Sequence, residues 1–279
     1  LFPLRKGNFD DERDVSLFDE VSLAKWKQML GTHDAVVIDE AQMIPKVGRA
    51  VKLLIDSMPD IQVFLSGSSS FPLANLTEEP LTGRKYDFLL LPLSFTELCS
   101  ARGFVQEYAA METRLMYGSY PVIVNDPPMA REHLHELTES YLYRDVLKHD
   151  GIRKPSLLKK LVFALARQIG SEVNAGELSQ LLNISRPTVE SYIALLEQSS
   201  IIFVLPSFSR NSRNELKKGR KVYFWDVGVR NSAINDFTSL DVRDDTGHLW
   251  ENYLIAERMK NNALRFRAGE RSSSFWRTS

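Results

Sequence analysis

The chain has 279 residues, of which 43% are hydrophobic and 10% aromatic, enough to form a sizeable core in two or three domains. Its single cysteine, Cys99, excludes an internal disulfide, and no apolar run is long enough to span a membrane, so we expect a cytoplasmic protein. The net charge of −1 conceals an asymmetry, because residues 1–100 carry 10 Lys and Arg against 15 Asp and Glu, whereas residues 208–279 carry 14 against 9. A basic C-terminal part suits nucleic acid or an acidic partner, and charge pairing within the chain explains it equally well.

The first hundred residues predict alternating helices and strands. Val47, Val51 and Leu54 recur at spacings of three and four, which predicts a helix. Short apolar runs on either side of it predict buried strands. In chain order we expect a helix over residues 23–30, a strand over 35–38, a helix over 47–58, and strands over 61–65 and 88–93. This rhythm is typical of a doubly wound parallel sheet.

The remaining residues begin with helical patterns, including an amphipathic helix over residues 134–147. Further on, Ser185 is a good N-cap and Pro187 suits the first turn of a helix. We expect helices over 157–168, over 175–182 and after Ser185, then a strand over 201–205. Three helices with a tight turn and a strand are typical of a winged helix-turn-helix. Beyond it we expect a strand over 222–225, a helix over 247–261 and the start of a strand at Phe275.

The run VVIDEAQ, residues 36–42, has two carboxylates directly after a buried strand. Asp39 and Glu40 follow Ile38, at the point where an open α/β sheet binds its ligands. Adjacent acids beside an apolar strand are costly unless a cation or a substrate uses them. The pair fits a Walker B motif, in which Asp39 holds Mg²⁺ through water and Glu40 orients the water that attacks the γ-phosphate of ATP. The alternative is an acidic turn that caps the following helix.

Two further features suggest phosphate contacts. Ser66 or Ser68, after the strand at 61–65, can sense a γ-phosphate, although a simple Gly/Ser turn is the commoner reading. Arg84, after a turn glycine, can reach a phosphate of its own or a neighbouring subunit as an arginine finger, or be an ordinary surface arginine. The phosphate loop G-x-x-x-x-G-K-[ST] does not occur in these residues. The sequence therefore predicts half of a nucleotide site.

The sequence gives arguments both for and against nucleic-acid binding by the predicted helix-turn-helix. Its third helix offers one basic residue, Arg186, and Glu190 would repel phosphate. A basic run after the predicted strand can grip phosphates as a wing. This run includes Arg210, Arg213, Lys217 and Lys218.

Acids also gather near the C-terminus. Asp226 follows a predicted strand, and Glu251 and Glu257 share a predicted helix. Such carboxylates can hold a metal for phosphodiester cleavage, but nucleases of that kind need further acids and a Lys on later strands, so a structural role is favoured. The histidines show no paired-ligand spacing with cysteine, and no zinc site is expected.

Taken together, these stretches resemble prokaryotic predicted ATPases of the AAA+ superfamily, which carry an AAA+ domain, a winged helix and a restriction-endonuclease-like C-terminal domain of unknown function. The resemblance lies in VVIDEAQ (36–42), FLSGSSS (64–70), LTGRKYDFLLLPLSFTEL (81–98), the helix-turn-helix, YFWDVGVRN (223–231) and GHLWENYLIAE (247–257). It implies that Asp39 and Glu40 are the Walker B pair, that Ser66 or Ser68 is at the sensor position, and that Arg84 belongs to the Gly-Arg element. It also implies a phosphate loop before residue 1, on a strand inside the parallel sheet.

The resulting expectation is an α/β protein with a parallel sheet. We expect an incomplete AAA+ P-loop-type core over residues 1–98, a helical linker or lid over 99–155, a winged helix-turn-helix over 156–207 and a partial α/β, nuclease-like domain over 208–279. The expected function is that of a fragment of a Mg²⁺-dependent ATPase, inactive by itself without the Walker A loop. The alternative is a non-catalytic DNA- or protein-binding module with a degenerate ATPase half. Neither involves a membrane, and both allow an oligomer.

Overall fold

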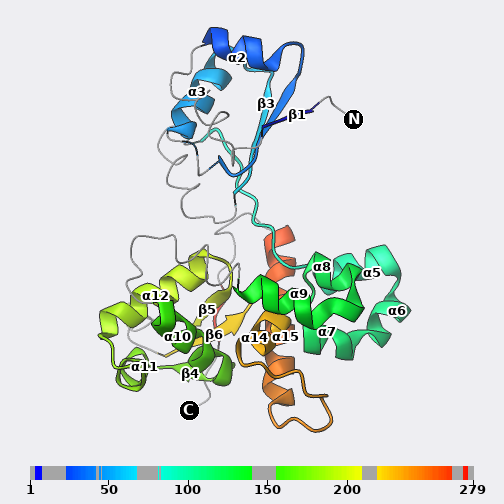
Figure 1. Cartoon of the computed structure of the whole chain (residues 1–279), viewed down its shortest axis with the longest axis vertical. Coiled ribbons are helices and arrows are strands. Elements are labelled where there is room, and N and C mark those ends of the chain that lie inside the picture. The colour runs from blue at the N-terminus through cyan, green and yellow to red at the C-terminus, as the bar shows by residue number, and fades with distance from the viewer. Residues whose placement is uncertain are drawn as a thin grey trace. The chain divides into compact units, whose positions relative to one another are not determined.

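The computed structural model describes residues 4–7, 23–41, 44, 46–67, 81, 83–139, 155–208, 219–265 and 273–275. The chain divides into two compact units, residues 1–89 and 90–279, and each is described by itself (Figure 1). Within the described residues, no helix is both long enough and apolar enough to cross a membrane.

The first unit contains a parallel sheet and two helices. Its elements are β1 (Leu4–Gly7), α2 (Leu23–Leu30), β2 (Ala35–Ile38), α3 (Val47–Ser57) and β3 (Gln62–Leu65). The strand order is β1-β2-β3 and both pairings are parallel, which confirms the predicted α/β class. The four predicted elements that form lie within one residue of their expected positions. The sequence pattern does not predict β1, because LRKG has no apolar run, and its pairing with β2 is a tertiary contact.

Both helices of this unit pack on one face of the sheet. Val36 and Ile38 of β2 share a buried cluster with Trp26 of α2 and Val51 of α3. Alternate residues of a strand point to the same face, so α2 and α3 cover the same side of β2. The indole N–H of Trp26 donates to the carbonyl oxygen of Ala50 at 3.0 Å, which ties the two helices together.

Two predictions about strands are wrong. β3 is not a buried strand, since Phe64 is 54% exposed and Gln62 is also exposed. Residues 88–93 form no strand, and Phe88 is 87% exposed. An apolar run becomes a strand only where a neighbouring backbone accepts its hydrogen bonds. Among the described residues, no strand pairs with residues 88–93 or with the outer edge of β3.

The second unit begins with short helices. They are α5 (Phe95–Arg102), α6 (Phe104–Ala109), α7 (Met111–Tyr117), α8 (Pro121–Asn125), the 3₁₀ turn η2 (Pro127–Met129) and α9 (Ala130–Leu137). Ser94 and Glu97 form a capping box at the start of α5, which fixes where the helix begins. The helix predicted over residues 134–147 begins earlier, at Ala130, and its second half lies outside the described residues.

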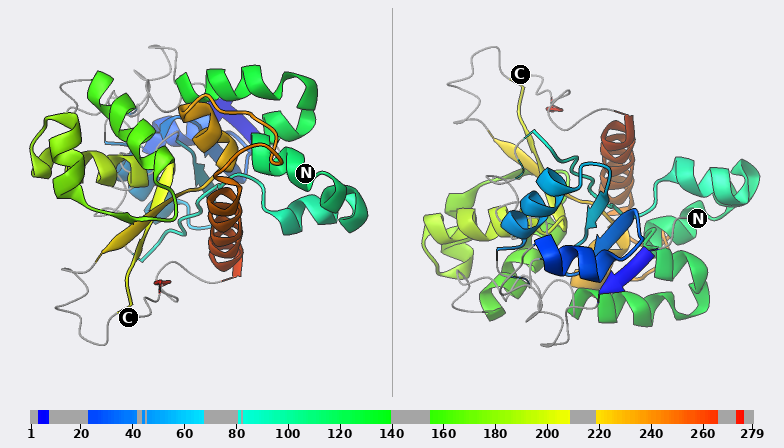
Figure 2. Two further views of the ribbon diagram at one scale, coloured as in Figure 1. Left: turned by 90° about the horizontal axis from the view of Figure 1, so that it is seen from below. Right: turned by 90° about the horizontal axis from the view of Figure 1, so that it is seen from above.

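Three longer helices and a small antiparallel sheet follow. Their bounds are α10 (Pro155–Arg167), β4 (Glu172–Val173), α11 (Ala175–Leu182), α12 (Arg186–Gln198), β5 (Ile202–Pro206) and β6 (Arg220–Phe224). The strand order is β4-β6-β5, and the three helices gather beside the sheet (Figures 1 and 2). Asn174 caps α11 and Ser185 caps α12 through backbone N–H groups of their first turns. These elements agree with the prediction to within two residues, except for β4, which is too short to leave a pattern.

The last two helices, α14 (Val227–Ala233) and α15 (Thr246–Arg265), complete one large core. That core contains residues of all three regions after residue 98 that the sequence suggests as separate domains. Examples are Leu115 and Leu134 from α7 and α9, Leu161 from α10, Ile193 from α12, Phe224 from β6 and Leu249 from α15. The predicted lid, winged helix and C-terminal domain therefore pack as one body, and their exact boundaries stay predictions. Phe275 forms a single parallel bridge with Ser207, next to the end of β5.

Candidate nucleotide site

The two predicted acids lie at the carboxyl end of β2. Asp39 and Glu40 follow the last strand residue, Ile38, and both are half-buried. Glu40 has a φ of 51°, in the left-handed region that non-glycine residues seldom occupy. The turn is held to β3, because Ser66 N donates to Ile38 O and Ala41 N donates to Ser66 O, both at 2.9 Å. The strained turn is thus fixed by the end of the neighbouring strand.

The structure brings Asp39 and Ser66 into direct contact. The Ser66 hydroxyl donates a hydrogen bond to Oδ1 of Asp39. Ile38 and Leu65 are opposite each other in the parallel register, so the residues that follow them meet at the same edge of the sheet. Ser68, the other predicted sensor residue, lies outside the described residues.

Arg84 is not brought to the acid pair. Its guanidinium pairs with Asp56 in the last turn of α3. Because α3 connects the carboxyl end of β2 to the amino end of β3, its last turn lies at the opposite end of the sheet from Asp39. Both side chains are about half-exposed, at 52% and 44%, so the pair contributes little stability. A role for Arg84 towards a neighbouring subunit remains a prediction.

Matches to known families divide the chain in a similar way. Residues 4–99 match a family described as "AAA domain". Residues 4–99 are AAA+ ATPase-like. Residues 108–240 match a family described as "Domain of unknown function (DUF8612)". The AAA+-like part therefore carries the acid pair, and the second match falls on the helices and the small sheet of the second unit.

Two similar proteins carry the description "uncharacterized protein". One from Methanocaldococcus jannaschii is 27% identical over 74% of this chain and 51% of its own length, and one from Haemophilus influenzae is 26% identical over 71% and 52%. The chain spans about half the length of the curated relatives it matches. Among solved structures, the Aeropyrum pernix ORC1 protein in complex with DNA aligns over 85% of this chain and 78% of its own, with 13% identity and a TM-score of 0.36. That score is too low to establish a shared fold.

The residues of the predicted helix-turn-helix have a different charge balance from the one that the sequence suggests. Arg186 is exposed at the first position of α12. Glu190 is not a free acid, because Arg220 of β6 pairs with it at 2.6 Å. Residues 30 apart in the chain leave no local signal for this pairing, so only the fold reveals it. The predicted wing residues Arg210, Arg213, Lys217 and Lys218 lie outside the described residues.

The C-terminal acids have structural partners. Asp226 accepts hydrogen bonds from the backbone N–H groups of Ser119, Gly228 and Val229, and burial raises the pKa of its carboxyl group. Glu251 accepts from Tyr223 at 2.6 Å and from Lys221 at 3.0 Å. In the part of the chain that the structure describes, no group of three or more His, Cys, Asp or Glu residues can hold a metal ion.

Proposed function

We propose that residues 4–99 contribute the acid side of a Mg²⁺-dependent ATP-hydrolysing site. Asp39 would hold the metal through water, and Glu40 would orient the water that attacks the γ-phosphate. The observation that carries the proposal is the contact between Ser66 and Asp39 at the carboxyl edge of β2 and β3. It lies within the residues that match an AAA domain. Parallel sheets bind their ligands at this edge.

The residues present fit the metal ion of a bound Mg²⁺–ATP complex. Asp39, Glu40 and Ser66 offer oxygen atoms, the ligand type that Mg²⁺ prefers. Bound Mg²⁺ would supply positive charge against the phosphate oxygens. The 279 residues contain no G-x-x-x-x-G-K-[ST] motif. We therefore assign the phosphate-binding loop to a segment outside them. We therefore expect this chain alone to bind ATP poorly.

The outer edge of β3 supports the idea of an additional strand. Among the described residues, β3 pairs with β2 and with no strand on its other side. Phe64 of β3 is 54% exposed. An open strand edge beside an exposed aromatic side chain is a template for a further strand. We propose that the strand carrying the phosphate loop pairs there.

Substitution of the proposed water-positioning acid tests the assignment in a longer protein that contains this chain and a phosphate loop. Glu40→Gln should keep ATP bound and lower turnover by about a hundredfold or more, because the amide cannot accept the proton of the attacking water. The matched control is Asp60→Asn, in the exposed turn before β3. Turnover and fluorescent-ATP binding are measured together. Unchanged turnover removes the assignment of Glu40, and micromolar ATP affinity of the 279-residue chain removes the need for an outside loop.

A second proposal concerns residues 155–224, which we infer to be a winged helix that contacts DNA or a protein. Three helices in succession and an antiparallel sheet of order β4-β6-β5 support it. The pairing of Glu190 with Arg220 removes one charge that would repel phosphate from α12. This function needs no ATP hydrolysis, so it stands as the alternative role of the chain.

A gel shift at low and moderate salt tests the DNA contact. Arg186→Ala should weaken binding several-fold, since an exposed arginine at the start of α12 is placed to contact phosphate. Arg167→Ala, on the exposed surface of α10, is the control and should bind like the unmodified chain. Absence of any shift at both salt concentrations excludes DNA and leaves a protein partner.

A further inference from the structure

A polar hollow in the second unit lies outside everything described above. It is formed between α9 and the end of α14 and has a volume of about 280 Å³. Arg131, His135 and Thr138 line it from the side of α9, and Ser232, Asn235 and Phe237 line it from the side of α14. Ligand pockets in proteins typically have roughly 300–1,000 Å³, so an occupant of this hollow is small. All its lining residues fall within the match over residues 108–240.

The guanidinium of Arg131 is pre-oriented at this hollow. Its central carbon lies 5.3 Å from the centre of the Phe237 ring, and that ring stacks on Tyr117 with 5.6 Å between centroids. Nη2 of Arg131 donates to Oδ1 of Asn235 at 3.4 Å, a long hydrogen bond that leaves the other donors available. Asn235 has a φ of 50° and ends α14 in the left-handed conformation that asparagine tolerates. The cation–π contact with Phe237 and the hydrogen bond to Asn235 thus hold the guanidinium beside the hollow.

Arg131 supplies the uncompensated charge of the hollow. No carboxylate of the described residues forms an ion pair with it. The one acid in the lining, Glu139, is held by Lys159, whose Nζ lies 2.9 Å from Oε2. The neighbouring Asp236 is turned towards Arg243, at 3.6 Å. Among the described side chains that line the hollow, Arg131 is therefore the charged group without an opposite charge in salt-bridge contact.

The carbonyl ends of α9 and α14 oppose an anion here, because helix C-termini carry a partial negative charge. Several of these carbonyls are capped. The Thr138 hydroxyl donates to Leu134 O at 2.7 Å, and Asp236 N donates to Asn231 O at 2.9 Å. A full charge on a planar, pre-oriented guanidinium outweighs two capped helix ends, which are worth about half a charge each before capping.

We propose that this hollow binds a small oxyanion, a phosphate or carboxylate group, through the guanidinium of Arg131. Planar, two-pronged donation to such a group is the specific chemistry of arginine. His135 adds a ring nitrogen at the wall. The proposed occupant belongs to a different unit from the acid pair, so this site does not depend on the ATPase proposal.

Two-dimensional NMR of the 279-residue chain tests the site, with inorganic phosphate and succinate titrated separately. We expect saturable chemical-shift changes of the amides of residues 131–139 and 232–237 with at least one probe. The probe that binds with the higher affinity shows whether the site prefers a phosphate or a carboxylate. Arg131→Gln should weaken binding by roughly tenfold or more, since a charge-assisted contact is lost. Arg131→Lys keeps the charge without the stacked plane and should fall in between.

Arg167→Gln is the matched control, because Arg167 also stacks on a phenylalanine, Phe163, at 5.7 Å, and does not line the hollow. It should bind within twofold of the unmodified chain. Since Arg131 is exposed, its substitution should leave the fold intact, and circular dichroism of each variant checks this. The proposal is overturned if neither probe gives saturable shifts or if Arg131→Gln binds as tightly as the unmodified chain. It is also overturned if Arg131→Gln and the control Arg167→Gln lose affinity equally.

Discussion

Ion pairs of one aspartate, Asp245, hold the loop that precedes α15. Arg230 and Arg243 are both buried, and both pair with Asp245 at 2.6 Å. Burial by itself would raise the pKa of Asp245, but hydrogen bonds from the two guanidinium groups and their charges lower it. Asp245 bridges the two buried arginines, and Asp236, 3.6 Å from Arg243, supplies the second negative charge that balances them.

Removal of this charge should destabilise the second unit. Asp245→Asn leaves two buried guanidinium groups underpaired and should lower the free energy of unfolding by about 3 kcal/mol in urea titrations at pH 7. Asp244→Asn, at the exposed neighbouring position, should change it by less than about 0.5 kcal/mol. A loss of equal size in both variants would show that the pairing has no special role.

The same pair predicts a pH dependence. Because the pKa of Asp245 is lowered in the folded chain, its contribution is present above the unfolded pKa of about 3.9 and is lost as the pH falls through the folded value. The difference in stability between the unmodified chain and Asp245→Asn should therefore shrink below about pH 4. A difference that is constant from pH 7 to pH 3 would contradict the assignment.

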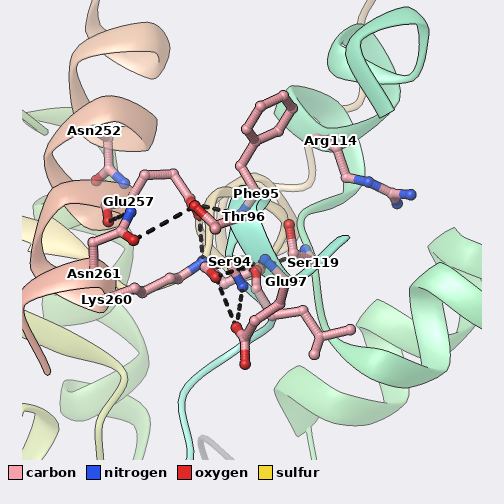
Figure 3. Close-up of polar contacts among 12 residues, drawn as sticks. Ser94, Phe95, Thr96, Glu97, Arg114, Ser119, Asn252, Glu257, Lys260 and Asn261 are labelled. Carbon is pink, nitrogen blue, oxygen red and sulfur yellow. Dashed lines mark hydrogen bonds and ion pairs between the residues drawn. The ribbon is translucent and has the colours of Figure 1, made fainter. Parts of the chain in front are cut away.

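At the scale of elements, α15 holds the beginning of α5 (Figure 3). Glu257 accepts from the backbone N–H of Phe95 at 2.6 Å, and Lys260 donates to Leu93 O at 3.3 Å and to Glu257 at 2.9 Å. Both charged side chains are buried, at 10% and 5% exposure. Ser119 continues the connection, since its carbonyl accepts from Leu93 N and its N–H donates to Asp226. Residues 93–95 are therefore held in place by α15 and Ser119.

Loss of the acid in this contact should loosen the start of α5. Glu257→Ala leaves Lys260 buried without a carboxylate and should cost about 3 kcal/mol, with faster amide hydrogen exchange at residues 93–98. Asn261→Ala is the control on the same helix, because its contact with Thr96 is exposed and long, at 3.5 Å. Protection of residues 93–98 that is unchanged in Glu257→Ala would show that the capping box alone fixes the helix.

The whole molecule consists of two compact units with separate hydrophobic clusters. Leu54 is fully buried in the cluster of the first unit, and Leu161 is fully buried in that of the second. Each unit buries its own apolar surface, which is the main favourable contribution to its folding. The two units should therefore unfold in separate transitions.

Calorimetry of two core variants tests this division. Leu54→Ala should lower the stability of one transition by about 2–5 kcal/mol and leave the other in place, and Leu161→Ala should do the reverse. Ala110→Gly, at the end of α6 outside both clusters, is the control for a small effect. A single transition that both leucine variants shift equally would mean that the units fold together.

Much of the local structure follows from the sequence. Ser185 and Pro187 predict the start of α12, and the acid pair after Ile38 predicts a turn at the end of β2, because caps and short apolar runs act over a few residues. The same patterns overestimate the strand at 88–93. An apolar run cannot report whether a neighbouring strand is present to pair with it.

The sequence by itself determined the α/β class of the first unit, the positions of α2, α3, α10, α11 and α12, and the place of Asp39 and Glu40 at a strand end, since these depend on spacing and composition. Only the tertiary structure decided that Ser66 contacts Asp39, that Arg84 pairs with Asp56, that Arg220 neutralises Glu190, and that three predicted domains share one core. The physical reason is that each of these contacts joins residues about thirty or more positions apart. Their closeness is a property of packing, which no local pattern records.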